Sequence, residues 1–208
     1  PDALGLRLPE GFSARILAES GIPVVGDLLD PILGPVLGYD WHTFPDGGAT
    51  FPAEDGGWVY VSNSESVPGG VGALRFDAAG QVIDAYQILA GTIINCAGGP
   101  TPWGTWLSCE EIPTGRVHEC NPFGGILDAR ARPALGIFDH EAVAVDPVRR
   151  QLFLTEDAGD ATFYRFVPSA IDWPAGAERP ALEDGALQVM VVPGVADSRD
   201  TPFESDPV

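Results

Sequence analysis

The chain has 208 residues, and its 26 Gly and 20 Pro make about a fifth of it helix-interrupting residues, which excludes a helical bundle. A hydrophobic share of 45% and a charged share of 20% are typical of a folded protein with a core. The formal net charge of −19 disfavours a nucleic-acid partner and an anionic membrane, because both bind clustered basic side chains.

The sequence contains no lysine, so every basic side chain belongs to an arginine. This excludes a Walker-type lysine, a Schiff-base lysine and a pyridoxal-phosphate lysine. No apolar run approaches the roughly 18 residues that a membrane span needs. The acidic balance is typical of a protein that gathers cations, or of one with a solvated acidic surface.

Residues 1–57 are expected to form a loop-rich lead-in with the first strands. The chain starts at Pro1 and shows no basic or apolar signal segment, so we expect that a leader has been removed or that the chain begins inside a longer protein. The apolar stretch between Ile22 and Trp41 is interrupted by Pro31 and Pro35, which predicts an ordered loop.

Short runs rich in β-branched and aromatic residues follow, each ended by Gly, Pro or Asp. Their alternation predicts strands, and no convincing helix is found. The predicted strands begin at Trp58, Gly72, Val82, Thr105, Ala142, Gln151, Thr162 and Leu187. We expect residues 58–192 to consist of repeated four-stranded units.

The spacing of these strands indicates an internal repeat. Ser62, Ser108 and Thr155 each follow an apolar strand and precede an acid, at intervals of 46 and 47 residues. A four-stranded unit of about 40–50 residues is the signature of a β-propeller blade. The sequence therefore predicts an all-β fold in which residues 1–208 form a single, incomplete β-propeller domain of about four blades, part of a roughly six-bladed ring.

Acids that occupy the same place in successive blades are expected to converge on the propeller axis. The acids in question are Glu65, Glu110, Glu111, Glu156 and Asp157. Crowded carboxylates repel one another, and a multivalent cation such as Ca²⁺, which prefers oxygen ligands, relieves that repulsion. The alternative is that these strand-end acids point separately into solvent.

The three cysteines suggest one disulfide and one unpaired thiol. Cys109 and Cys120 flank the turn at Thr114 and Gly115, and a hairpin centred there places them opposite each other, which suits a disulfide. Such a bond implies an oxidising compartment and leaves Cys96 free. Taken alone, Cys96 is interpreted as a small buried hydrophobe.

The segment NCAGGPTPWGTWLSCEE, from Asn95 to Glu111, resembles the signature of the PhoX-type alkaline phosphatase family. The blocks Pro133–Pro147 and Leu152–Pro168 resemble the same family in the same order. The strand WVYVSNSE, from Trp58, occupies the place of the family's VNHE-like strand and has Ser64 where His is often found. The resemblance therefore runs from about Trp58 to Pro168.

This resemblance implies an exported, periplasmic or extracellular β-propeller that hydrolyses small phosphomonoesters with a central cluster of iron (Fe³⁺) and calcium ions. The positions that match metal ligands of the family are Cys96, Glu110 or Glu111, Glu141, Glu156 and Glu65. Independently of the family, one thiolate among carboxylates suits a transition metal. His140 is expected to be a structural partner rather than a ligand, since no second His follows at zinc-protease spacing, and His42 and Asp46 are further residues that could approach the axis.

A chain with a formal net charge of −19 would repel phosphate esters, so we expect bound metals to make the local electrostatic potential positive. We further expect a metal-bound oxygen, rather than a side-chain nucleophile, to attack the phosphoryl group. Family members are longer and should supply further acids and a phosphate-binding Arg. The 208 residues alone are therefore expected to be inactive. We expect the protein to be a monomer, or the remainder of the propeller to be supplied by sequence outside this chain. Two alternatives stay open: a calcium-dependent propeller lactonase or esterase, which would not need Cys96, and a non-catalytic calcium-stabilised binding propeller.

Overall fold

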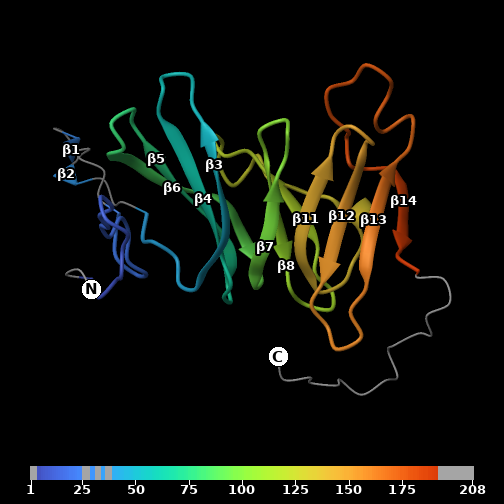
Figure 1. The fold of residues 1–208 in the computed structure, drawn as a ribbon, viewed down its shortest axis with the longest axis horizontal. Coiled ribbons are helices and arrows are strands. Elements are labelled where there is room, and N and C mark those ends of the chain that lie inside the picture. The colour runs from blue at the N-terminus through green and yellow to red at the C-terminus, as the bar shows by residue number, and fades with distance from the viewer. Residues whose placement is uncertain (1–3, 25–28, 31–33, 36–38, 192–208) are drawn as a thin grey trace.

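The computed structural model describes residues 4–24, 29–30, 34–35 and 39–191 (Figure 1). The loop predicted between Ile22 and Trp41 lies largely outside these residues. There the described chain forms the short pair β1 (Leu29–Asp30) and β2 (Gly34–Pro35), and an isolated antiparallel bridge joins Pro23 to Asp40. In the described parts, no helix is long and apolar enough to cross a membrane.

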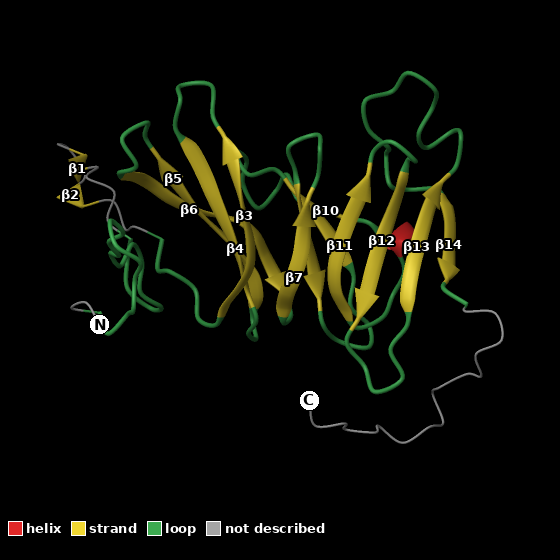
Figure 2. Cartoon of the chain, in the orientation of Figure 1, coloured by secondary structure: helices red, strands yellow, loops and turns green. Residues whose placement is uncertain are grey.

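The described chain is built from strands, as predicted, and its one helical element is the 3-10 turn η1 (Pro133–Leu135) (Figure 2). The first sheet contains β3 (Pro45–Pro52), β4 (Trp58–Ser64), β5 (Gly69–Phe76) and β6 (Val82–Thr92). The second contains β7 (Asn95–Pro100), β8 (Trp106–Glu110), β9 (Val117–Cys120) and β10 (Arg130–Ala131). The third contains β11 (His140–Asp146), β12 (Gln151–Glu156), β13 (Phe163–Pro168) and β14 (Gly185–Val189). In each sheet every strand pairs antiparallel with its neighbour in sequence, so all three are meanders.

The three sheets follow one another in chain order, and each packs on the next (Figure 1). Val59 and Val61 on one face of the first sheet pack with Trp106 of the second. Leu107, which alternates with Trp106 along β8, points the other way and packs with Leu152 of the third sheet. The described four-stranded sheets number three rather than about four, and they form no closed ring, so the propeller stays a prediction.

The first strands of the three sheets lie close together, because β7 lies against both β3 and β11. Two glycines make this approach possible. A Cβ at Gly47 would lie 2.7 Å from Cα of Ala97, and a Cβ at Gly99 would collide with the carbonyl oxygen of Val143. The glycines that let β3 and β7 approach their neighbours, and the prolines at the ends of these strands, made both strands hard to predict from the sequence, since Gly and Pro are depleted in ordinary strands.

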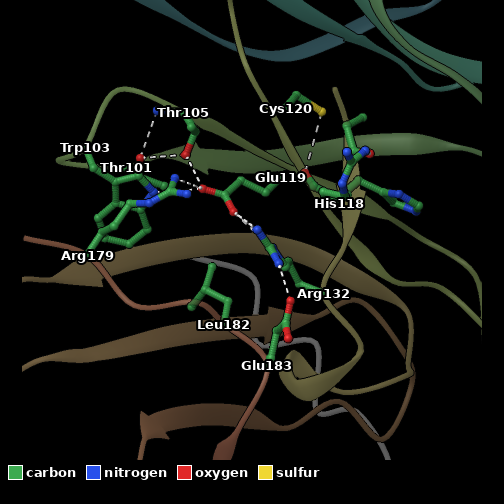
Figure 3. A network of polar contacts seen from close by, with 12 residues as sticks. Thr101, Trp103, Thr105, His118, Glu119, Cys120, Arg132, Arg179, Leu182 and Glu183 are labelled. Atoms are coloured by element: carbon green, nitrogen blue, oxygen red, sulfur yellow. Dashed lines mark hydrogen bonds and ion pairs between the residues drawn. The ribbon is translucent and has the colours of Figure 1, made fainter. Parts of the chain in front are cut away.

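A buried carboxylate joins the second sheet to the segments that border the third (Figure 3). Oε1 of Glu119, on β9, accepts hydrogen bonds from Trp103 Nε1 at 2.8 Å and Thr105 Oγ1 at 2.7 Å. Its Oε2 accepts from Arg132 at 2.6 and 2.9 Å, and Arg179 lies 3.4 Å from Oε1. Burial by itself raises the pKa of Glu119, but these hydrogen bonds and the Arg132 charge outweigh it and hold the pKa below its ordinary value.

The predicted disulfide between Cys109 and Cys120 is wrong, because both thiols are free. Cys109 pairs with Val117 and Cys120 with Trp106, so the hairpin is centred nearer β8 than the predicted turn. The two side chains consequently point to opposite faces of the sheet, Cys109 into the core shared with the third sheet and Cys120 into the core shared with the first. The predicted disulfide was the only residue-level support for an oxidising compartment, and the free thiols remove that support.

Candidate metal centre

The first strand of each sheet carries the same irregularity near its start. The pairing register shifts between Pro45 and Gly48, between Asn95 and Gly98, and between His140 and Val143. A shift of this kind is a β-bulge, which redirects the side chains at its position. The first residues inside the three bulges are Asp46, Cys96 and Glu141.

In each of the three sheets, the residue that follows the second strand makes the same backbone hydrogen bond. The backbone N–H groups of these residues donate to the carbonyl of the residue two positions before the bulged one. The three pairs are Glu65 to Phe44 at 2.9 Å, Glu111 to Ile94 at 2.9 Å and Asp157 to Asp139 at 3.1 Å. The shared bond places Glu65, Glu111 and Asp157 at the same end of their sheets as the bulges.

These two sets of positions bring one thiol and four carboxylates together. Potential ligand atoms of Asp46, Glu65 and Cys96 lie within 4.8 Å of one another, and so do those of Cys96, Glu111 and Glu141. The Cys96 thiol, common to both groups, donates to Glu141 at 3.3 Å (Oε2) and 3.5 Å (Oε1). We call these five residues the Cys96 cluster.

The carboxylates of the Cys96 cluster repel one another. Burial raises the pKa of Glu141 and, although the hydrogen bond from the Cys96 thiol lowers it, the charges of Glu111, Asp157 and Asp46 raise it further. Burial and the charges of Asp46 and Glu111 likewise raise the pKa of Glu65. Within the described chain, no ion pair joins a member of the cluster to an arginine or histidine. The negative charge at this site therefore has no counter-charge from these residues.

The same carboxylates also affect the pKa of the Cys96 thiol. Burial raises the pKa of Cys96, and hydrogen bonding to the Glu111 and Glu141 carboxylates and the charges of Glu141 and Asp46 raise it further. A multivalent cation would stabilise all five donors, since it would displace the thiol proton and neutralise the carboxylates. Thiolate sulfur selects transition metals and carboxylate oxygen suits hard cations, so this donor set could hold a transition metal together with a hard cation.

Four predicted metal-binding residues, Glu65, Cys96, Glu111 and Glu141, come together, and Asp157 lies near enough to affect Glu141. Asp46 completes the cluster. The sequence indicated Asp46 as a residue that could approach the axis, although it precedes Cys96 by 50 residues, which is not the interval of 46 that relates Glu65 to Glu111.

Glu110 lies outside the cluster, although it is adjacent to Glu111. Its carboxylate accepts hydrogen bonds from the backbone N–H groups of Ile93 at 3.0 Å and Arg116 at 3.2 Å, and Oε2 lies 3.2 Å from His118 Nε2. Burial raises the pKa of Glu110, but the bonds from His118 and from these backbone groups outweigh it and lower the pKa overall. Glu110 is thus engaged in holding the β8–β9 hairpin.

Glu156 occupies the equivalent place in the third sheet and has the equivalent contacts. Its Oε2 accepts from the backbone N–H of Thr162 at 2.9 Å and from the Tyr164 hydroxyl at 3.0 Å. These partners are six and eight residues further along, as Arg116 and His118 are for Glu110. Glu156 therefore closes the β12–β13 hairpin.

The two histidines singled out in the sequence also lie outside the cluster. His42 contacts the Tyr39 hydroxyl at 3.1 Å and Ser62 Oγ at 3.3 Å, and burial lowers its pKa to about 4. His140 is fully buried, with Nε2 3.2 Å from the carbonyl of Gly136 and its ring against Phe138.

The fold and the site define an all-β protein with a thiol–carboxylate centre shared among sheets. The profile of the family described as "Alkaline phosphatase PhoX" matches residues 68–198, and the chain belongs to this PhoX alkaline phosphatase family. The match includes Cys96, Glu111 and Glu141, whereas Asp46 and Glu65 precede it. No curated protein and no solved structure matches the chain.

Proposed function

We propose that this chain forms part of a metal-dependent phosphomonoester hydrolase whose three sheets are consecutive blades of a β-propeller. The observation that carries this proposal is the convergence of the Cys96 thiol with four carboxylates from all three sheets, with no cationic side chain paired to them among the described residues. Membership of the PhoX family supports phosphomonoesters as the substrate class.

The propeller part of the proposal rests on the equivalence of the sheets. Val61 of the first sheet and Leu107 of the second are fully buried under the sheet that follows. Phe153 and Phe163 stack at 5.6 Å on the corresponding face of the third sheet, and Phe163 remains 38% exposed. We expect a further sheet of the same ring to cover this face.

Bound iron and calcium would supply the positive charge and Lewis acidity that a phosphoryl group needs at an otherwise acidic site. Cys96, Glu111 and Glu141 would hold the transition metal, and Asp46 and Glu65, beside the same thiolate, would hold the harder cation. The bulges and the repeated backbone bonds preorganise these donors, so little rearrangement is needed on binding. Glu141, which accepts the hydrogen bond of the thiol, is suitably placed to pass the proton that Cys96 must release to solvent, because a carboxylate that binds a metal has to be deprotonated.

The Cys96 thiol also distinguishes the proposed phosphomonoester hydrolase from the two alternative functions. A calcium-dependent lactonase or a calcium-stabilised binding propeller needs oxygen ligands alone, and neither accounts for Cys96 in the middle of the cluster. Export to the periplasm or the extracellular space is proposed with the enzyme, on the family resemblance.

The experiment measures metal content first, because this does not depend on turnover by the chain alone. The purified protein, Cys96→Ser and Glu156→Gln are loaded with iron and calcium, desalted and analysed for both elements. We expect iron and calcium in the unmodified protein and in Glu156→Gln, and loss of iron from Cys96→Ser. Equal iron in all three would contradict the proposed centre.

Hydrolysis of an aryl phosphomonoester is then followed with and without chelator in protein that carries the remainder of the proposed ring, since the 208 residues alone are expected to be inactive. An aryl lactone is the comparison substrate. Phosphomonoester turnover that stops on metal removal supports the proposal. Turnover of the lactone alone, or phosphate release that is insensitive to chelator, would overturn it.

A further inference from the structure

Asn63, near the end of β4, connects the first sheet to the bulge that carries Cys96. The side chain is fully buried. Its Nδ2 donates to the carbonyl oxygens of Cys96 at 2.8 Å and Ala97 at 2.6 Å. Its Oδ1 accepts from Trp106 Nε1 and Ser108 Oγ, both at 2.9 Å. Two donors and two acceptor positions are all that a carboxamide has, so Asn63 is fully satisfied.

This network permits one orientation of the Asn63 amide. Reversing it would place the NH₂ group against the Trp106 donor and the oxygen against two carbonyls. Ser108 is itself fixed, because its Oγ accepts from Asn95 Nδ2 at 2.9 Å. Buried polar networks in which every group is paired hold a single geometry.

The two carbonyls that Asn63 binds belong to the bulged residues of β7. The register of β7 and β8 breaks between Asn95 and Gly98, so Cys96 and Ala97 lie outside the regular ladder of their own sheet. The bulge in the third sheet is stabilised from within, since Ala142 N–H donates to Thr155 Oγ1 at 3.0 Å. The Cys96 bulge receives its side-chain support from a neighbouring sheet instead.

We propose that Asn63 is the positioning residue of the Cys96 metal ligand. This rests on the proposed function, because it assumes that Cys96 binds a metal. By holding the carbonyls of Cys96 and Ala97, Asn63 directs the Cys96 side chain toward the carboxylates. Asn63 also precedes Glu65 by two residues, so the same contact sets the distance between the first-sheet acids and the thiol. Residues that orient a ligand without touching the metal typically account for about 10–100-fold in metal affinity.

Asn63→Asp provides the sharpest test. It keeps an acceptor for Trp106 and Ser108 but replaces the two donors to the carbonyls of Cys96 and Ala97. The added negative charge alone would strengthen the binding of a cation, so weaker binding would have to come from lost positioning. Ser108→Ala is the matched control, since it removes a buried hydrogen bond of Asn63 and leaves the carbonyl contacts. Asn63→Ala, without new charge, is the second variant if Asn63→Asp fails to fold.

The readout is titration with Co²⁺, followed by the near-ultraviolet charge-transfer band of a thiolate–cobalt bond, with thermal unfolding as the check on folding. We expect about 10–100-fold weaker binding and a reduced band for Asn63→Asp and Asn63→Ala, and a change within about threefold for Ser108→Ala. Unchanged affinity and band in both Asn63 variants would overturn the inference, as would an equal loss in Ser108→Ala. If the unmodified protein shows no band beyond that of Cys96→Ser, the proposed function itself fails.

Discussion

Sγ of Cys96 lies 3.3 Å from Oε2 of Glu141, although 45 residues separate them and they belong to different sheets. The contact joins β7 of the second sheet to β11 of the third through the first residue of each bulge. A thiol that hydrogen-bonds a carboxylate in a negative field keeps its proton until a cation arrives.

Glu141 is expected to matter for metal affinity, whereas Glu156 is expected to matter for stability alone. Glu141→Gln removes a charged candidate metal ligand, whose Oε2 accepts the hydrogen bond of the Cys96 thiol at 3.3 Å, and should weaken Co²⁺ binding at least about tenfold. Glu156→Gln removes a carboxylate that binds Thr162 and Tyr164, so it should lower the unfolding temperature and leave the affinity within about threefold. Equal losses of affinity in the two variants would contradict the placement of these carboxylates.

The metal-free cluster should lose stability as the pH rises. The pKa values of Glu65 and Glu141 are raised above the ordinary 4.5, by burial first and then by neighbouring carboxylates. The folded chain therefore keeps protons that the unfolded chain has released. Their contribution is fully present below the ordinary pKa and is lost as the pH rises through the raised values.

The measurement is the unfolding temperature of Glu141→Gln minus that of the unmodified protein, in chelator, from about pH 4 to about pH 8. The difference should become more positive as the pH rises, because the variant carries one charge fewer in the cluster. Saturating calcium should reverse this trend. A difference that does not change with pH would show that the carboxylates do not repel one another.

Glu119 is expected to be the main electrostatic support between the second and third sheets. Glu119→Gln leaves Arg132 buried without its full counter-charge, and breaking such a pair costs about 3 kcal/mol or more in the free energy of unfolding. Glu183→Gln removes the exposed partner of the same arginine, with a side chain 73% exposed, and should change it by no more than about 0.5 kcal/mol. Denaturant unfolding distinguishes the two, and equal effects would contradict this assignment.

Gly99 is expected to tolerate no side chain, because a Cβ there meets the carbonyl oxygen of Val143 on the neighbouring sheet. Gly99→Ala should cost about 2 kcal/mol or more and weaken Co²⁺ binding, since it pushes β7 from β11 and separates Cys96 from Glu141. Gly125→Ala, where no atom lies within 4 Å of the added group, is the control. A fully stable Gly99→Ala with unchanged affinity would show that the sheets need not approach this closely.

All three cysteines are expected to be free thiols. Alkylation of the unfolded, unreduced protein should label three sulfurs by mass spectrometry, and the native protein should react far more slowly because all three are buried. A Cys109–Cys120 crosslink in the unreduced sample would contradict the observed hairpin register.

The sequence was informative where a repeated pattern reflects a repeated structure. Alternation located β4, β8 and β12, and the interval of 46 residues from Glu65 to Glu111 predicted that they occupy equivalent places. It was less informative for Glu110 and Glu111, because adjacent side chains at a strand end point in opposite directions and the residue numbers do not say which one faces the cluster. Glu156 was assigned to the metal for the same reason.

The sequence by itself determined an all-β chain of repeated units, the family and a thiol among acids, because alternation, spacing and motif are local properties of a chain. The tertiary structure alone decided which acids meet Cys96, that Asp46 joins them, and that Cys109 and Cys120 stay apart. Those outcomes depend on bulges, hairpin register and the approach of one sheet to the next. A shift of one residue in any of these turns a side chain to the opposite face, and no pattern within a single strand reports it.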